Sequence, residues 1–394
     1  MAQTKIKPEL IDGGVGTDWQ STIQTTNFTA ASGKGYFVDT TSGSITITLP
    51  AGVVGAQISI QDYAGTFDTN NAVLNANGTE KIQGDTVAGQ ITTKNATTTL
   101  VYQDSVKGWT AQNITPQTID ISYLVVAGGG GGGWAYGGGG GAGGYKTNYQ
   151  GTPFSGFAAT NYTVTVGGGG AGAAQSGQRV NGNNSVFSTI TSTAGGGGGS
   201  DAIIAGANGG SGGGGTYVSG AGGSGISGEG NDGGSGSPNV SSGNAAAGGG
   251  GGAGAVGVSS TDKNTGGSGG AGLSNSITGS AVDYAGGGGG GCGLNSSGNP
   301  GSGGTGGGAS GGKSSTGGNA TNNTGGGAGG GGGSGYYPGG NGGSGVVILR
   351  YPNTKTLTVP SGSGLITSHV NTNISGTSDK YTRFTGGTGT ISFS

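Results

Sequence analysis

Residues 123–133 read YLVVAGGGGGG, so an apolar segment of strand character leads directly into a run of six glycines. Residues 342–351 read GGSGVVILRY and reverse this order, from glycine into an apolar segment. Glycine makes up 108 of the 394 residues, and most of these glycines lie between the two segments. Glycine has no side chain to bury and loses the most backbone entropy on folding. The region between is therefore either a flexible linker or a structure in which backbones pack against one another.

The composition excludes several classes of partner. Charged residues form 8% of the chain, the formal net charge is −2, and the 14 Lys and Arg residues are scattered singly. No basic patch is present that would neutralise phosphates, so a nucleic-acid partner is excluded. The longest apolar stretch, residues 123–127, is too short to span a bilayer, and we expect no membrane insertion. Residues 1–5 lead into no apolar signal sequence, so we expect a chain that is made in a cytoplasm.

Residues 1–119 have the pattern of a compact β module. The strongest signal is SITITL at residues 44–49, where polar and apolar residues alternate strictly up to Pro50. Further short apolar runs lie at residues 57–60, 99–102 and 109–111. Turn sequences at residues 41–43 and 51–52 separate these runs, and none has helical periodicity. We expect an N-terminal antiparallel β-sandwich or barrel that serves for attachment or as a spacer.

Residues 353–394 return to ordinary β composition and are expected to form a short C-terminal β segment. Strand patterns lie at residues 355–360, 381–384 and 390–393. The pair Gly386-Gly387 predicts a hairpin turn between the last two strands. With the glycine-rich domain at residues 120–352, the sequence predicts three domains and a mainly β fold.

The glycine runs cannot form collagen, because collagen needs glycine at every third position together with abundant proline. Consecutive glycines can instead form the extended polyproline-II type of helix, which has three residues per turn and no internal hydrogen bonds. In such a polyglycine-II helix every N–H and C=O points outward and needs a partner. If many helices lie side by side, they become each other's partners. An interior helix must then be glycine on all three faces, whereas a helix at the rim can carry a side chain at every third residue.

The residues between the runs favour a bundle over a linker. A flexible Gly/Ser linker has no need of bulky residues. Here the breaks contain Trp134, Tyr217, Tyr284 and Tyr336, and a longer insert reads YTVTV at residues 162–166. The pattern is run, turn, run, turn, so we expect an ordered bundle of polyglycine-II helices bracketed by β-strands.

Aromatic residues at the turns are the best candidates for a binding site. If successive runs reverse direction, one end of the bundle carries the candidate receptor-binding residues Trp134, Tyr136, Tyr217, Tyr336 and Tyr337. The other end then carries Tyr145, Tyr149, Phe154, Phe157, Tyr162 and Tyr284. Rigid rings with Asn, Ser and Thr nearby suit the recognition of sugars or protein surfaces. The alternative is that these rings only cap the bundle and cover its exposed backbone.

No motif predicts an enzyme, a cofactor or a metal. Residues 307–314, GGASGGKS, satisfy the phosphate-binding P-loop pattern, but neither the preceding strand nor the following helix is predicted. His369 is the only histidine and has no nucleophile motif near it, and Cys292 is the only cysteine. The numbers of these residues exclude a His/Cys metal site. The acidic residues form no calcium loop.

The sequence resembles bacteriophage tail-fibre and adhesin proteins with a glycine-rich domain. Residues 123–128 and 342–351 resemble the strands that bracket that domain, and residues 28–40 and 62–67 resemble a β module that recurs in phage fibres. Residues 381–393 are similar to fibre C-termini.

The resemblance implies a virion protein, assembled in the host cytoplasm, whose turns contact a host-surface glycan or outer-membrane protein. It also implies contacts with other virion tail proteins through the N-terminal module, and a homotrimer for many fibres. A purely structural fibre or spacer, without a receptor-binding role of its own, is the other function that the sequence allows.

Overall fold

The structure is a computed structural model that describes residues 17–112, 114–116, 118–157, 160–237, 244–293, 298–333 and 335–394. Throughout these ranges the regular elements are β-strands, and no helix is found among them. The strands form four sheets of five or six strands and one two-stranded hairpin. The predicted mainly β class is therefore confirmed for the described residues. The chain separates into two compact units: the first ends at Ile119 but also includes Gly156–Thr160, and the second comprises Asp120–Ser155 and Asn161–Ser394.

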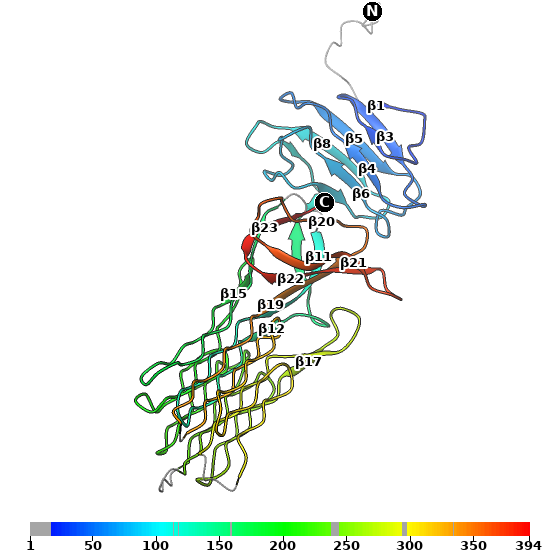
Figure 1. The fold of residues 1–394 in the computed structure, drawn as a ribbon. Coiled ribbons are helices and arrows are strands. Elements are labelled where there is room, and N and C mark those ends of the chain that lie inside the picture. The colour runs from blue at the N-terminus through cyan, green and yellow to red at the C-terminus, as the bar shows by residue number, and fades with distance from the viewer. Residues whose placement is uncertain are drawn as a thin grey trace, which may run out of the picture. The chain divides into compact units, whose positions relative to one another are not determined.

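The first unit contains two five-stranded sheets (Figure 1). The first sheet has the order β1 (Asp18–Trp19), β3 (Lys34–Val38), β5 (Gln57–Asp62), β8 (Thr97–Tyr102) and β9 (Trp109–Thr110). The second has the order β10 (Ile114–Pro116), β7 (Gly89–Ile91), β6 (Ala72–Asn75), β4 (Ile45–Thr48) and β2 (Phe28–Thr29). Both sheets contribute to one apolar core, in which Ile47, Ile60, Leu74 and Trp109 are fully buried.

The expected antiparallel arrangement of this unit is wrong for its first half. Strand β3 pairs with β5, and β4 with β6, in parallel. The reason is that β3 to β6 alternate between the two sheets, so neighbours in one sheet are two strands apart in sequence and run the same way. The predicted turns at residues 41–43 and 51–52 thus carry the chain from one sheet to the other. Antiparallel pairing begins with β6–β7 and β5–β8.

The second unit contains the glycine-rich region and two larger sheets. One sheet has the order β12 (Tyr145–Thr147), β11 (Thr118–Val126), β19 (Val346–Pro352), β22 (Asp379–Gly386) and β21 (Ile366–Asn373), and β13 (Phe154–Phe157) also pairs with β11. The other has the order β16 (Ile190–Ser192), β15 (Ser185–Phe187), β14 (Tyr162–Thr165), β23 (Thr388–Phe393) and β20 (Leu357–Thr358). A separate hairpin joins β17 (Leu273–Asn275) to β18 (Val282–Tyr284).

The two strands that bracket the glycine-rich region pair with each other. β11 and β19 are antiparallel, with a register that runs from Ser122 opposite Arg350 to Val126 opposite Val346. Their inward residues, including Leu124 and Val126, are fully buried. The prediction that the ends of this region meet is confirmed. The glycine-rich region therefore begins and ends on neighbouring strands of one sheet, which we call the clasp sheet.

Residues 353–394 belong to the same compact unit as the glycine-rich region. β22 extends the clasp sheet by pairing with β19, whereas β23 pairs with β14 and β20 in the other sheet. The predicted hairpin at Gly386-Gly387 is therefore wrong. Gly387 has a φ of 85°, and the turn there directs the chain from one sheet to the next rather than back along β22.

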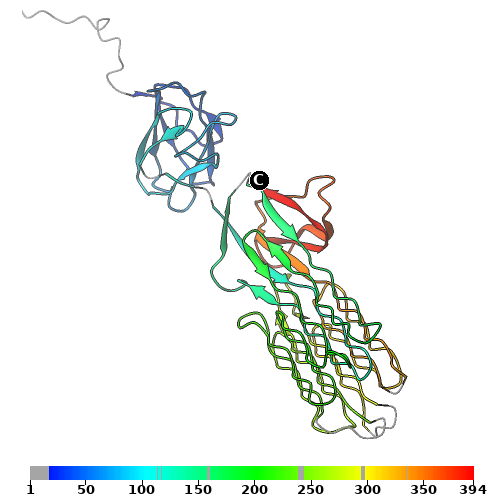
Figure 2. The ribbon, with the colours of Figure 1, turned by 90° about the vertical axis from the view of Figure 1, so that its left-hand side faces the viewer.

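Between β11 and β19 the chain runs back and forth in extended segments that lie alongside one another (Figures 1 and 2). Successive N–H groups of residues 128–133 donate to three different segments in turn, and the sequence of partners repeats after three residues. The donor–acceptor pairs are Gly128–Asn183, Gly129–Gly343, Gly130–Gly141, Gly131–Val180, Gly132–Gly340 and Gly133–Gly138.

The carbonyl groups of residues 128–133 bind three further segments. They accept N–H groups in the pairs Gly195–Gly128, Gly198–Gly131, Gly170–Gly129, Ala173–Gly132, Ala328–Gly130 and Gly331–Gly133, with the donor first. This run therefore has six hydrogen-bonded neighbours, and residues 286–291 are surrounded in the same way. A Cβ at Gly131 would overlap the carbonyl oxygen of Ala171, so only glycine permits this approach.

We call the hydrogen-bonded glycine-rich segments between β11 and β19 the glycine bundle. The segments at its rim carry side chains. Along residues 167–174 the exposed positions are Gly168, Ala171 and Ala174, three residues apart. Asparagines on other rim segments have the same spacing. Their side-chain oxygens accept backbone N–H groups in the pairs Asn181–Gly197 (2.9 Å), Asn184–Ala194 (2.8 Å), Asn319–Asn341 (2.7 Å) and Asn322–Ser344 (3.2 Å). These amides take the place of a further backbone segment.

We expect an alanine substitution to destabilise the protein strongly at an interior glycine of the bundle and hardly at all at a rim glycine. We expect Gly131→Ala to lower the free energy of unfolding by at least about 3 kcal/mol, because its Cβ meets the backbone of a neighbouring segment. The matched change Gly168→Ala places a Cβ at the exposed rim, where the nearest atom is 3.7 Å away. It should leave stability unchanged or raise it by up to about 1 kcal/mol. Thermal unfolding of both variants tests this, and equal effects would contradict the arrangement.

Because the phenol of Tyr351 in β19 is buried, we expect the folded protein to lose stability at high pH. Burial is the main cause that raises the pKa of Tyr351 from 10.0 to about 12. Its hydroxyl lies 2.6 Å from the Thr382 hydroxyl and donates to Asn371 at 3.0 Å. Below pH 10 the phenol is neutral in both folded and unfolded chains. Above pH 10 the unfolded phenol ionises first, so stability falls as the pH rises towards 12.

The size of this loss is on the order of 2–3 kcal/mol for Tyr351 alone. Urea unfolding of the wild type and of Tyr351→Phe between pH 8 and pH 11.5 measures it. At pH 8 the variant should have a lower free energy of unfolding than the wild type, because it lacks the hydrogen bonds of the Tyr351 hydroxyl. Its free energy of unfolding should then fall less steeply as the pH rises. The same slope in both proteins would assign the loss to other groups.

Candidate functional site

The candidate site lies at the end of the glycine bundle that is remote from the sheets. β11 continues directly into residues 128–133, so the turn that follows this run lies away from β11. The reversal is tight, since Gly133 N–H donates to the Gly138 carbonyl at 2.9 Å. A second turn is closed by Gly220 N–H and the Thr216 carbonyl. A third is closed by Tyr336 N–H and the Gly333 carbonyl.

These three turns bring the predicted aromatic residues together, although Trp134 and Tyr337 lie 203 residues apart in sequence. Trp134 stacks on Tyr336, with ring centroids 5.2 Å apart and planes inclined by 18°. Tyr136 contacts Tyr217 at 5.0 Å with a 54° tilt. The carbonyl of Tyr337 accepts the N–H of Ala135 at 3.1 Å, which joins the first turn to the third. We call the three turns, residues 134–136, 217–219 and 335–337, the tip.

The tip backbone is held in a conformation that L-residues seldom adopt. Ala135, Tyr136, Val218, Ser219 and Tyr336 have φ values of 44°, 51°, 59°, 56° and 54°. The left-handed region costs a non-glycine residue roughly 1–2 kcal/mol. Cross-links between turns hold it there, since the Thr216 hydroxyl donates to the Tyr136 carbonyl. The Tyr136 ring also fills the space beside Gly333. Strain of this kind is typical of sites that hold side chains in fixed positions.

The tip exposes a mixed apolar and polar surface. Tyr336 is 63% exposed and Val218 is 49% exposed, whereas Trp134, Tyr136, Tyr217 and Tyr337 are half-buried. Burial is the first cause, and the Asp201 carboxylate the second, that raise the pKa of the Tyr217 phenol. The phenol therefore stays a neutral hydrogen-bond donor at physiological pH.

Sequence reasoning missed the aliphatic part of this surface. Ile203 and Ile204 are 36% and 43% exposed, in a turn where Ser200 and Ile203 form a bridge. The Ile204 carbonyl accepts the Thr216 N–H at 2.8 Å, so this turn lies beside the tip. A signal was present in the sequence, because DAII at residues 201–204 places two adjacent isoleucines between glycine runs without a strand pattern.

The aromatic residues expected at the opposite end of the bundle lie in or beside the sheets. Tyr145, Tyr162 and Tyr284 are 8%, 6% and 2% exposed. The Phe154 ring lies 5.9 Å from Tyr162 and 5.2 Å from Phe187. Tyr145 and Tyr284 belong to an apolar cluster with Leu124 and Ile348 of the clasp sheet. Tyr145, Tyr162 and Tyr284 are therefore core residues, whereas Tyr336 and Val218 at the tip are exposed.

The remaining motifs provide no second chemistry within the described residues. The P-loop-like residues 307–314 follow no strand closer than β18 and precede no helix, and Lys313 Nζ donates to the Gly298 carbonyl at 3.1 Å. His369 is exposed and contacts Ser368 at 3.2 Å and the Tyr381 ring at 5.3 Å. In the part of the chain that is described, no three His, Cys, Asp or Glu side chains gather as metal ligands. Those same ranges contain no helix able to cross a bilayer.

The comparison with protein families identifies the central region of this chain. Residues 104–352 match the family described as a glycine-rich domain, and the match ends at Pro352, the last residue of β19. The comparison with curated proteins gives no match. Since the matched residues make up more than half of the chain, the protein belongs to the glycine-rich domain family.

Proposed function

We propose that this protein is a bacteriophage tail-fibre component whose tip recognises a receptor on the host surface. The observation that carries the proposal is the convergence of three turns, distant in sequence, at which Trp134 packs on Tyr336 and Tyr136 on Tyr217, with Tyr336 exposed and the other three rings half-buried. Rings fixed in this way offer contact area at little cost in conformational entropy on binding. The receptor would be a glycan or an outer-membrane protein.

The scaffold of this display would be a bundle of polyglycine-II helices. A helix with three residues per turn directs successive N–H groups to three sides, and its carbonyl groups likewise. The three-residue repeat of partners along residues 128–133 and its six neighbours agree with this geometry. So does the spacing of exposed positions at Gly168, Ala171 and Ala174. Such a scaffold is independent of the side chains at its turns, so the tip can change while the bundle stays the same.

The other parts of the proposal follow from the resemblance to phage fibres. The first unit would join the protein to other tail proteins of the virion, and three copies would associate into a homotrimer. The protein would need neither cofactor nor catalytic activity, since recognition alone is its task.

A purely structural fibre or spacer is the second candidate function, and one feature of the tip favours it. The stacked pair Trp134 and Tyr336 covers part of its own apolar surface, and the Tyr136 ring covers the backbone at Gly333. Rings that only cap the bundle would do the same. Recognition is favoured by four exposed side chains, those of Ile203, Ile204, Val218 and Tyr336. Residues that only covered the end of the bundle would not need to expose apolar surface to solvent.

Amide hydrogen exchange tests the scaffold. We expect slow exchange throughout residues 129–133, because each N–H donates to a neighbouring segment. At the rim, Gly170 and Ala173 should exchange slowly, since they donate to Gly129 and Gly132, and Ala171 between them should exchange fast. Fast exchange across the whole region would instead indicate a flexible linker. Protection that alternates every second residue would indicate β-strands rather than polyglycine-II helices.

Cell binding tests recognition by the tip. We expect the labelled full-length protein to bind saturably to some members of a panel of intact Gram-negative bacteria. Tyr336→Ala and Ile204→Ala should each weaken that binding at least tenfold, about 1.4 kcal/mol, as expected for central apolar contacts. Tyr63→Ala is the matched control, because Tyr63 is 56% exposed in the first unit. Absence of saturable binding across the panel, or equal binding by all variants, would favour the structural function.

A further inference from the structure

A second concave surface lies on the second unit, beside β12 and the β17–β18 hairpin. It consists of two adjoining hollows with volumes of about 310 Å³ and 380 Å³. Both hollows are lined by Tyr145, Thr147 and Leu273, so they form one continuous groove. Each volume lies in the lower part of the range of small-ligand sites, roughly 300–1,000 Å³. The groove is remote from the tip, since β12 belongs to the clasp sheet.

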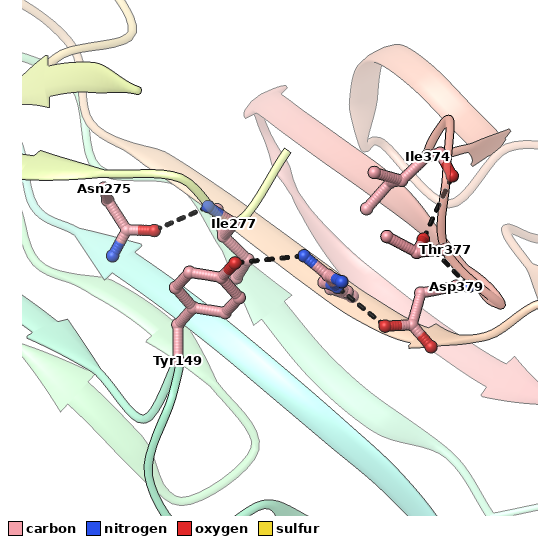
Figure 3. A network of polar contacts seen from close by, with 7 residues as sticks. Tyr149, Asn275, Ile277, Ile374, Thr377 and Asp379 are labelled. Carbon is pink, nitrogen blue, oxygen red and sulfur yellow. Dashed lines mark hydrogen bonds and ion pairs between the residues drawn. The ribbon is translucent and has the colours of Figure 1, made fainter. Parts of the chain in front are cut away.

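The wall of the groove on the β12 side is held in place by an ionic network. The Tyr149 hydroxyl accepts a hydrogen bond from Arg350 at 3.2 Å, and the guanidinium carbon lies 5.3 Å from the centre of the Tyr149 ring. Arg350 in turn binds the Asp379 carboxylate at 2.8 Å. Figure 3 shows this network, which continues from Asp379 through Thr377 to the Ile374 carbonyl. The aromatic ring at the groove is thus fixed before any ligand arrives.

The wall on the hairpin side is equally well supported. Asn275 accepts the N–H of Ile277 at 2.8 Å (Figure 3) and donates to the Tyr145 hydroxyl at 2.8 Å. Ile277 is fully buried, and Gly279 of the same loop lies against the Ile374 side chain. The hairpin is therefore anchored on both sides of its loop. Because the Tyr145 hydroxyl accepts from Asn275, its own proton is available for another acceptor.

The groove has polar groups but little net charge. Its buried carboxylate, Glu229, is 7% exposed, and Lys146 Nζ lies 2.9 Å from it. Glu229 also accepts the N–H of Thr193 at 2.7 Å, so its charge is compensated within the protein. The other described polar side chains of the lining carry hydroxyl and amide groups. The polar side chains of Gln150 and Ser274 are exposed, and the apolar side chain of Leu273 is 40% exposed.

We propose that this groove binds a neutral saccharide. A sugar ring has an apolar face of C–H groups, which Tyr149 and Leu273 would contact, and a rim of hydroxyl groups. Buried hydroxyl groups need partners, and Tyr145, Gln150 and Ser274 supply both donors and acceptors. A charged ligand would find no counter-charge among the described lining residues, because Glu229 and Lys146 neutralise each other. The site is separate from the tip, and it does not depend on the proposed function of the tip.

A screen followed by titration tests this site. The full-length protein is applied to an array of neutral oligosaccharides, and the strongest binder is then titrated by calorimetry. We expect Gln150→Gly to weaken binding at least tenfold. Gln150 has a φ of 67°, which glycine adopts readily, so the fold should be kept while the amide is lost. Ser274→Trp, which fills the groove from an exposed strand position, should abolish binding.

Tyr336→Ala is the control that separates the two sites, because it changes the tip and leaves the groove intact. It should bind the saccharide like the wild type. The proposal is overturned if no neutral oligosaccharide binds, if both groove variants bind like the wild type, or if Tyr336→Ala abolishes the binding. Loss of cell adhesion in the tip variants with normal saccharide binding would leave the groove assignment standing, and the reverse pattern would leave the tip assignment standing.

Discussion

The hydrogen-bonding demand of the glycine backbone is the constraint on which this structure depends. An extended glycine segment has no side chains to bury and no internal hydrogen bonds, so each N–H and C=O must find a partner outside the segment. In residues 128–133 the partners are supplied by six neighbouring segments. Each bond contributes only about 1 kcal/mol net, but the bonds are many and the alternative is an unpaired buried group. Glycine is required here because a Cβ would occupy the place of a neighbouring carbonyl.

Because backbone hydrogen bonds stabilise the glycine bundle, its stability depends little on the side chains at its turns. An ordinary core ties stability to the identity of large side chains, so a surface loop and the core beneath it constrain each other. In the glycine bundle the stabilising atoms belong to the backbone, and the turns at the tip are joined by bonds such as Ala135 N–H to the Tyr337 carbonyl. The sheet end has the opposite character. There Tyr145, Tyr284 and Ile348 form a conventional apolar cluster that fixes where the bundle begins.

The parts of this fold that the sequence predicts are those encoded by local patterns. The apolar segments that became β11 and β19 stood out against glycine, and their pairing followed from their positions at the two ends of the region. Alternation at residues 44–49 predicted β4 but could not name its partner, so parallel pairing was missed. A glycine pair predicts a turn without saying where the chain goes, so the hairpin at Gly386-Gly387 was wrong. The groove depends on contacts such as Asn275 with Tyr145, 130 residues apart, and no local pattern predicts such a contact.

The same constraint raises the question of why the bundle ends where it does. The outermost segments present unpaired backbone groups, as the edge strand of a sheet does, and such an edge invites another chain to pair. The rim asparagines answer part of this demand. Asn181 and Asn184, three residues apart, offer side-chain oxygens to Gly197 and Ala194, which would otherwise need a further segment. An asparagine side chain ends in an amide, the same group that a backbone segment would present. At the rim of the glycine bundle, every third residue faces away from the neighbouring segments. An asparagine at such a position therefore takes the place of a further backbone segment and ends the bundle there.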